Sequence, residues 1–248
     1  MSSDEEQDNS VIFSDLEFGA PSDAAGRDRH IGPLHSGGCG YTHQADSYSI
    51  DVHDQPEKGL SFQIWPSSHT LIRYLELPVH DWQGKHVLEL GCGCGLVGLC
   101  AAACGAHVLL TDLPEPLELT RQNIRVNEQT IQVAGGSAAA QELSWGVTSV
   151  SQLPEEWQAP DTILAADVVY RQDLFQPLLH SLDKLCGPST VVLLAHVRRW
   201  KRDKRFFKAL SKTFSITDIT STVDEDANHF TSNTRGALRL FQLRRLNP

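Results

Sequence analysis

Four closely spaced glycines mark the stretch of this sequence best suited to chemistry, VLELGCGCGLVG at residues 87–98. An apolar run contains the acid Glu89, and glycines follow at positions 91, 93, 95 and 98, before an alanine-rich segment. This pattern predicts a strand, a tight turn and a helix. Glycine permits backbone conformations that side chains forbid, and it brings peptide N–H groups close to a ligand at a helix N-terminus. The stretch therefore predicts a nucleotide-binding turn.

Two nucleotide cofactors are candidates for this turn. The last three of the four glycines match the dinucleotide pattern G-x-G-x-x-G, but that register starts two residues after Gly91 has already ended the strand. Counted from Gly91, the third glycine of the pattern would fall on Leu96. The spacing E-x-G-x-G-x-G, which begins at Glu89, fits better the first motif of methyltransferases that use S-adenosylmethionine (SAM).

A second acid lies about twenty residues further along the chain, at the spacing expected for the end of the next strand. Residues 107–111, HVLLT, form a short β-rich run, and Asp112 follows it. A carboxylate at this position can accept hydrogen bonds from both ribose hydroxyls of a nucleoside. Because NAD and SAM share that ribose, Asp112 indicates a nucleoside without identifying the cofactor.

The elements that must position these residues alternate along the chain. Strands separated by helices of this length predict a Rossmann-like, doubly wound and mainly parallel sheet, since parallel neighbours need a crossover. The last two strands are joined by a polar stretch and predict an antiparallel hairpin at the sheet edge, which makes seven strands in total. The expected strands cover 86–90, 107–111, part of 133–143, 162–166, 190–195, 215–219 and 238–244, and the expected helices cover 96–104, 115–127, 174–185 and 204–213.

The N-terminal part of the chain has a different character. Residues 1–45 are acidic and then rich in Gly, Ser and His, so we expect a disordered tail there and one folded domain, which holds the glycine turn, over residues 46–248. Residues 48–52 and 60–64 are expected to pair as a small hairpin over the cofactor. Trp65 and Pro66 come next, and apolar residues at helical spacing predict a helix that ends near Leu77.

Ligands of open α/β sheets bind beyond the carboxyl ends of the strands, so the residues that follow each strand are site candidates. Trp145 follows the third strand, where its indole could cover an adenine, although a core tryptophan without a ligand explains it equally well. Ala166 is small enough to leave room beside a cofactor, and Asp167 and Tyr170 come directly after it. Tyr170 also fits a simple packing role.

The whole composition limits the functional classes. The chain has 248 residues, a net charge of −10 and 40% hydrophobic residues, which suits one α/β domain and argues against a nucleic-acid partner. No apolar run approaches the roughly 20 residues of a membrane span, and the N-terminus lacks a signal peptide. We expect a monomer in the cytoplasm, with the nucleus as an alternative. We expect no metal site, and we read the six cysteines as packing residues rather than disulfide partners.

One charge cluster stands apart from the acidic balance. Residues 198–205 hold six Lys or Arg in eight positions. Nuclear import or an anionic partner would explain the cluster, but a solvated loop and helix start explains it better, because charge runs are usually exposed.

The set of motifs resembles the seven-β-strand protein lysine methyltransferases. Trp65, ELGCGCGLVG, TDLP, ELSWG, AADVVY and LLAHVRRWKRDKRFF follow one another at natural spacing, and the resemblance is greatest to the methyltransferase-like 21 group, whose members modify Hsp70-type chaperones and the AAA ATPase valosin-containing protein. It implies SAM as the cofactor and a protein substrate that presents a lysine. Its implied cofactor contacts are Trp65, Gly91, Cys92, Gly93, Asp112, Trp145 and Ala166, and its D-x-x-Y motif at the lysine end is Asp167 and Tyr170.

Methyl transfer to lysine requires an amine without its proton, since free lysine has a pKa near 10.4. We therefore expect Asp167 and Tyr170 to shape an apolar channel and orient the amine, with Asp167 as a candidate acceptor of the departing proton. Three other functions remain open from the sequence: a small-molecule N-methyltransferase on the same fold, an NAD-dependent oxidoreductase, and a SAM-binding adaptor without catalysis.

Overall fold

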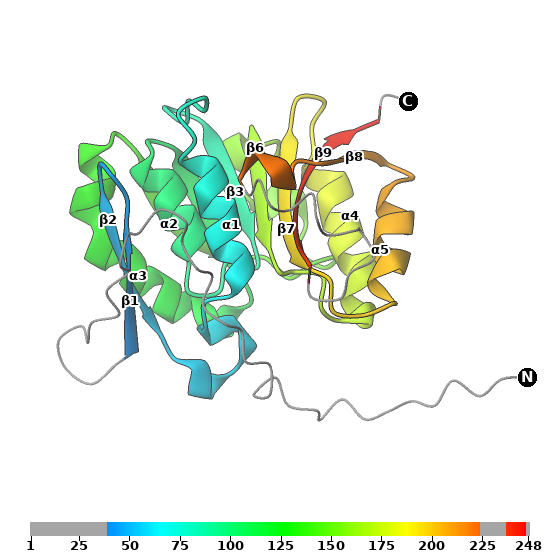
Figure 1. Ribbon diagram of the computed structural model, residues 1–248, viewed down its shortest axis with the longest axis horizontal. Helices are drawn as coiled ribbons and strands as arrows, with labels where there is room; N and C mark the ends of the chain where they lie inside the picture. The colour runs from blue at the N-terminus through cyan, green and yellow to red at the C-terminus, as the bar shows by residue number, and fades with distance from the viewer. Residues whose placement is uncertain (1–38, 224–236, 247–248) are drawn as a thin grey trace, which may run out of the picture.

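The computed structural model describes residues 39–223 and 237–246, which form a twisted sheet covered by helices on both faces (Figure 1). Seven strands form the sheet in the order β5-β4-β3-β6-β7-β9-β8, and β1 and β2 form a separate antiparallel pair. The strands are β1 Cys39–Gln44, β2 Ser49–Asp54, β3 His86–Leu90, β4 His107–Asp112, β5 Ser137–Glu142, β6 Thr162–Ala166, β7 Val191–Val197, β8 Phe214–Asp218 and β9 Leu238–Arg245. The helices are α1 Pro66–Leu75, α2 Leu96–Ala103, α3 Pro114–Val133, α4 Phe175–Leu185 and α5 Asp203–Leu210.

Strand residues alternate between two hydrophobic layers, because successive side chains of a strand point to opposite faces. Val87 belongs to the layer under α1, α2 and α3, whereas the next residue, Leu88, belongs to the layer under α4 and α5. In Figure 1, α1, α2 and α3 lie on one side of the sheet and α4 and α5 on the other. With both faces covered, the parallel strands are apolar almost throughout, as is usual for buried parallel sheets.

Five neighbouring strands of the sheet are parallel, so their carboxyl ends, and the loops that follow them, lie at the same edge. Strands β5, β4, β3, β6 and β7 are parallel neighbours, while β9 pairs antiparallel with both β7 and β8. The prediction of a mainly parallel, seven-stranded, doubly wound sheet with an antiparallel hairpin at its edge is confirmed. The residues that join the hairpin, 224–236, lie outside the described part of the chain.

The predicted hairpin between residues 48–52 and 60–64 is wrong. Strand β2 pairs with β1, which begins at Cys39, and Leu60–Phe62 forms a short 3-10 helix. The free edge of β2 is satisfied by two buried side chains of α3: Asn123 exchanges two hydrogen bonds with the backbone of His53, and Asn127 exchanges two with that of Asp51. Because the asparagines are one helical turn apart, they bond alternate residues of the strand as a neighbouring strand would.

Other boundaries also move. The expected tail of residues 1–45 ends too late, since β1 occupies 39–44, and residues 1–38 lie outside the described residues. Helix α1 ends at Leu75 rather than near Leu77, and α3 runs to Val133, beyond the expected end at residue 127. The long α3 ends where Gly135 adopts a positive φ of 78°, so only residues 137–142 of the expected strand segment 133–143 are extended.

Candidate active site

A pocket of about 1060 Å³, including the space that opens to solvent, lies beyond the carboxyl ends of the parallel strands. Its walls come from the loops that follow β3, β4, β5, β6 and β7 and from the segment before α1. This is the expected position for a ligand on an open α/β sheet. The structure brings together all nine residues singled out in the sequence, which line the pocket: Trp65, Gly91, Cys92, Gly93, Asp112, Trp145, Ala166, Asp167 and Tyr170.

The glycine turn forms the floor of this pocket. Gly91 and Gly93 have φ values of 66° and 53°, in the left-handed region that side chains rarely adopt. A Cβ atom at Gly93 would lie 2.9 Å from the carbonyl oxygen of Ser61, and one at Gly91 would lie 3.1 Å from the indole of Trp145. Both the backbone conformation and the close neighbours therefore require glycine, and the turn exposes main chain to the pocket.

Gly98, the last glycine of the motif, has a different reason to lack a side chain. A Cβ atom there would lie 2.6 Å from a carboxyl oxygen of Glu89, which accepts a hydrogen bond of 2.9 Å from the Gly98 N–H. Glu89 is only 2% exposed, and burial raises the pKa of its carboxyl to about 8. Gly98, which completes the apparent dinucleotide pattern, therefore leaves space for the carboxyl group of Glu89.

Asp112 connects the end of β4 to the same turn. Its Oδ2 accepts a hydrogen bond of 2.8 Å from the Gly93 N–H, and its Oδ1 accepts one of 2.7 Å from the Leu113 N–H. Burial raises the pKa of this carboxyl, and the two N–H donors oppose the rise. Each oxygen retains a second lone pair, so the carboxylate can still accept hydrogen bonds from a ligand in the pocket.

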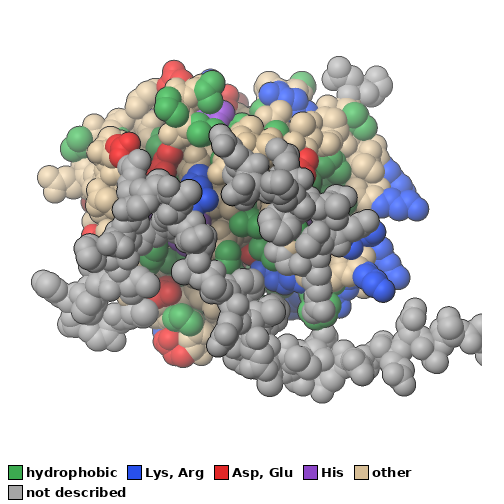
Figure 2. All heavy atoms as spheres, viewed as in Figure 1, with side chains coloured by type: hydrophobic (Ala, Val, Ile, Leu, Met, Phe, Trp, Pro, Cys, Tyr) green, Lys and Arg blue, Asp and Glu red, His purple; other side chains and the backbone are tan. Residues whose placement is uncertain are grey.

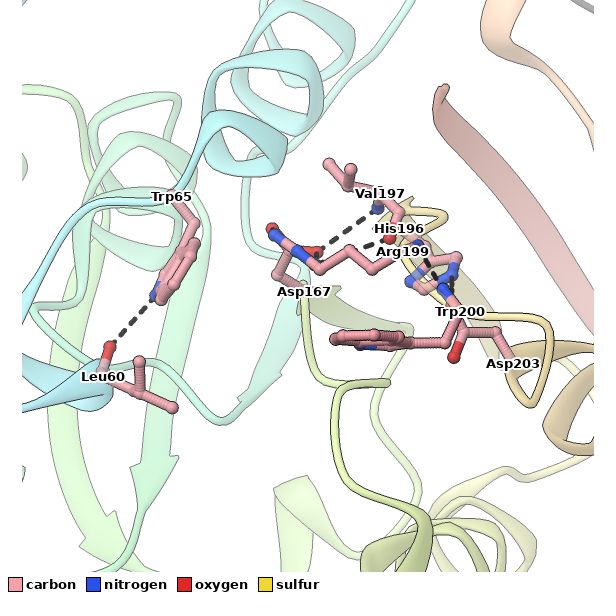
Figure 3. Close-up of polar contacts among 8 residues, drawn as sticks. All are labelled: Leu60, Trp65, Asp167, His196, Val197, Arg199, Trp200 and Asp203. Carbon is pink, nitrogen blue, oxygen red and sulfur yellow. Dashed lines mark hydrogen bonds and ion pairs between the residues drawn. The ribbon is translucent and has the colours of Figure 1, made fainter. Parts of the chain in front are cut away.

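Asp167 follows β6 and has an unusual backbone. Its φ of 58° is the one positive value at a non-glycine residue among the described residues. The guanidinium of Arg199 donates to both of its carboxylate oxygens, with Nη1–Oδ1 at 2.7 Å and Nη2–Oδ2 at 2.9 Å (Figure 3). The two side chains are 9% and 4% exposed. A buried bidentate ion pair therefore closes this end of the pocket.

Aromatic side chains complete the walls. The Nε1 of Trp65 donates to the Leu60 carbonyl at 3.0 Å, and the Arg199 guanidinium carbon lies 5.3 Å from the centre of the Trp65 ring (Figure 3). Trp145 lies against Gly91. Burial raises the pKa of Tyr170 above its ordinary value of 10.0, so its hydroxyl keeps its proton at neutral pH.

The sequence pattern does not identify Arg199, which belongs to the basic run 198–205. The expectation that this run is a solvated surface is wrong for Arg199 and for Asp203, which is 2% exposed. Asp203 accepts hydrogen bonds from the N–H groups of Arg199 and Trp200 and folds the loop inward. The sequence signal for this inward-folded loop is an acid, Asp203, four residues after Arg199 and shortly beyond the end of a strand.

Comparison with known proteins gives a consistent result. The profile of a family described as lysine methyltransferase matches residues 44–213. The protein N-lysine methyltransferase METTL21A of Mus musculus is 34% identical over 183 residues, which cover 73% of this chain and 81% of that protein. METTL21A of Danio rerio is 37% identical over 171 residues, covering 67% of this chain and 74% of that protein.

Solved structures agree on the fold. A TehB-like SAM-dependent methyltransferase from Corynebacterium glutamicum superposes with a TM-score of 0.53 at 16% identity, covering 74% of this chain and 89% of that one. A protein of Agrobacterium tumefaciens described as a predicted O-methyltransferase gives a TM-score of 0.53 at 15% identity, covering 73% of this chain and 81% of that one.

Among the described residues, no helix is both long and apolar enough to cross a membrane.

Proposed function

Because this chain belongs to the lysine methyltransferase family, we propose that it transfers a methyl group from SAM to a lysine side chain of a protein through the pocket described above. When bound, SAM supplies an activated methyl group on a positively charged sulfur. The observation that carries the proposal is the position of all nine expected residues around one pocket at the carboxyl ends of the parallel strands. The chain is a SAM-dependent protein-lysine methyltransferase, and the assignment of roles to its residues is our proposal.

The pocket fits such a cofactor in its backbone and in its charge. At Gly91 and Gly93 bare main chain lines the pocket, and a side chain at either position would press against Trp145 or Ser61. The carboxylate of Asp112 is fixed by two peptide N–H groups and can accept the ribose hydroxyls. The negative charge that suits a positively charged cofactor is that of Asp112, because the raised pKa of Glu89 keeps its carboxyl largely protonated at neutral pH.

The remaining residues are assigned by their position on the pocket. Trp145 and Ala166 would flank the adenine and the reacting end, Cys92 would contribute its backbone, and Trp65 would cover the cofactor from the segment before α1. Asp167 and Tyr170 would border the channel that the substrate lysine enters. A neutral Tyr170 hydroxyl can orient an amine by hydrogen bonding without adding charge.

The chemical step needs little beyond alignment and a deprotonated amine. The lysine ammonium first loses one proton; its nitrogen then forms an N–C bond while the S–C bond of the donor breaks, and the positive charge passes from sulfur to nitrogen. Alignment of two reactants can contribute roughly 7 to 11 kcal/mol. The residues of this pocket therefore bind, orient and exclude water.

We place the reaction in a reducing compartment such as the cytoplasm, and we propose that the chain acts as a monomer. Cys92, Cys94, Cys100, Cys104 and Cys186 are free thiols, as expected for a protein kept under reducing conditions. The nine expected pocket residues come from one chain. Fractionation of cells and light scattering on purified protein would test these two points.

The proposal is tested by incubating the full chain with cell extract and isotopically labelled SAM, followed by mass spectrometry. The expected result is label on a lysine of a small number of proteins, and an Hsp70-type chaperone and an AAA ATPase are the first candidates. The matched control is Asp112→Asn, which should remove most of the label. Label on an amine metabolite and on no protein would contradict the proposal.

A further inference from the structure

Arg199 connects two segments that meet only at the pocket, the end of β6 and the segment before α1. Resting on the proposed function, we propose that Arg199 is a positioning residue for methyl transfer, which neutralises Asp167 where the lysine enters and holds Trp65 over the pocket. Neither partner is near Arg199 in the sequence, since the contacts span residues 65, 167 and 199. Figure 3 shows the guanidinium between the carboxylate of Asp167 and the indole of Trp65.

The ion pair is buried and geometrically complete. Both oxygens of Asp167 receive a guanidinium N–H, and Oδ1 also accepts the Val197 N–H at 3.3 Å. Buried bidentate pairs of this kind leave an uncompensated charge when one partner is removed. The charge of the Asp167 carboxylate is therefore balanced by a cation of its own chain.

The pair also holds a strained backbone. At a residue other than glycine, a φ of 58° is unfavourable and persists only where the surroundings impose it. Here the Asp167 N–H donates to the Ala195 carbonyl at 2.9 Å, while the side chain is bound by Arg199, two residues beyond the end of β7. Arg199 thereby fixes the direction in which the chain leaves β6 toward Tyr170.

Arg199 is itself fixed from two sides. Asp203 accepts its peptide N–H at 3.2 Å, and the N–H of Arg198 donates to Ala237 at 3.1 Å. The guanidinium then lies over Trp65, whose indole N–H is held by Leu60. One side chain thus ties the loop after β7 to the segment that closes the opposite wall of the pocket.

The electrostatic consequence concerns the substrate. An unpaired carboxylate at the lysine channel would stabilise the ammonium form, which cannot accept a methyl group. The pair of carboxylate and guanidinium carries no net charge, so the amine loses its proton more easily than it would beside an unpaired carboxylate. The titratable groups that face this point are Asp112 and Glu89 at the glycine turn and Tyr170 after β6, and Asp203 with its neighbour His196 lies behind the arginine. The raised pKa of Glu89 leaves it largely neutral at pH 7.

The test measures how the initial rate of label transfer depends on pH. The reaction contains tritiated SAM and the most strongly labelled protein of a cell extract, and the rate rises with pH as the lysine amine loses its proton. Arg199→Gln should lower the rate at neutral pH by about tenfold and move this rise upward by about one pH unit, because an unpaired carboxylate favours the ammonium. Asp167→Asn should move it downward, since it leaves the guanidinium unpaired. The double variant should return the rise to its wild-type position.

The charge pattern of the loop supplies the control. Lys and Arg side chains gather on the side of the molecule where α5 lies (Figure 2), and Arg205 is exposed in that helix. Arg205→Gln removes the same charge from the same run and should leave the pH profile unchanged. Calorimetry with S-adenosylhomocysteine and thermal unfolding check that each variant is folded. If Arg199→Gln does not fold, the downward shift of Asp167→Asn decides alone.

Two outcomes would overturn the role of Arg199: an equal loss of rate at every pH in Arg199→Gln, or a double variant whose profile stays displaced. Failure of the proposed function would look different, because the wild-type chain would then label no protein lysine at any pH. The two results are therefore separable within one experiment.

Discussion

Asp112 and Asp167 stand on either side of strand β3, at the ends of its neighbours β4 and β6, and they face opposite chemical demands. Both are largely buried, at 8% and 7% exposure. The carboxylate of Asp112 is held by neutral peptide N–H groups, whereas that of Asp167 is held by a guanidinium. Neutral peptide groups leave the charge of Asp112 unbalanced, whereas the guanidinium of Arg199 balances that of Asp167.

The difference shows how one residue type serves both halves of the pocket. A cofactor with ribose hydroxyls and a cationic sulfur is attracted by a free carboxylate. A lysine that must be neutral is not, because a free carboxylate would raise its pKa. In the proposed roles, the hydrogen-bond donor to each acid, rather than the acid itself, distinguishes the cofactor-binding half of the pocket from the lysine-binding half.

The largest expected effect is a loss of cofactor affinity when Asp112 is replaced. If this loss were absent, the contrast between Asp112 and Asp167 would be wrong. Asp112→Asn removes a charged acceptor, and we expect calorimetry to show SAM binding weakened by about 10- to 100-fold. Asp167→Asn should change the affinity by less than about threefold, since Arg199 already occupies that carboxylate. Equal losses of SAM affinity in both variants would show that the two carboxylates contribute equally to cofactor binding.

The second effect is the pH dependence of the protein's stability that arises from Glu89, the other acid on the cofactor side of the pocket. A folded-state pKa of about 8, above the ordinary 4.5, means that the native state binds the proton more tightly than the unfolded chain. This contribution to the free energy of unfolding is fully present below pH 4.5 and is lost as the pH rises through 8. The loss is about 1.4 kcal/mol for each pH unit within that window.

Glu89→Gln keeps an acceptor for the Gly98 N–H and removes the titration. The variant should therefore gain thermal stability relative to the wild type as the pH rises from about 6 to about 8, by a few degrees in Tm. Thermal unfolding followed at several pH values measures this difference. A constant difference between the two proteins would show that Glu89 does not titrate in this range.

The smallest effect compares the two backbones. Asp167→Gly should be more stable than Asp167→Ala by about 1 kcal/mol, because alanine is strained at a positive φ. At Asp112, within strand β4, the order should reverse by about 0.5 to 1 kcal/mol, since glycine weakens strands. Chemical unfolding of the four variants gives both differences, and the same order at both sites would contradict a strained Asp167.

The difference between the surroundings of Asp112 and Asp167 also explains which parts of the site the sequence can predict. Gly91, Gly93 and Asp112 interact over short, regular spacings, so their pattern of glycines and acids is visible in the chain itself. The parallel order of the strands is visible for the same reason, because each crossover helix leaves its own periodicity.

Contacts between distant segments leave a weaker pattern. Nothing near Arg199 states that its partner is Asp167, 32 residues earlier, and a run of basic residues usually indicates solvent. Strand β2 likewise finds its second edge in side chains of α3, 70 and 76 residues later in the chain, rather than in the segment that follows it. Such pairings are decided by the fold as a whole.

The insertion of β9 between β7 and β8 has a consequence for biosynthesis. A nascent chain leaves the ribosome in sequence order, so β7 and β8 emerge while the place between them is still empty, and β7 presents an open edge until β9 arrives. The Arg198 N–H bonds Ala237, next to β9, which places the loop of Arg199 among the last parts to settle. Translational pausing before residue 238 would therefore yield a particle with its glycine turn formed and its reacting end unfinished, a natural client for chaperones.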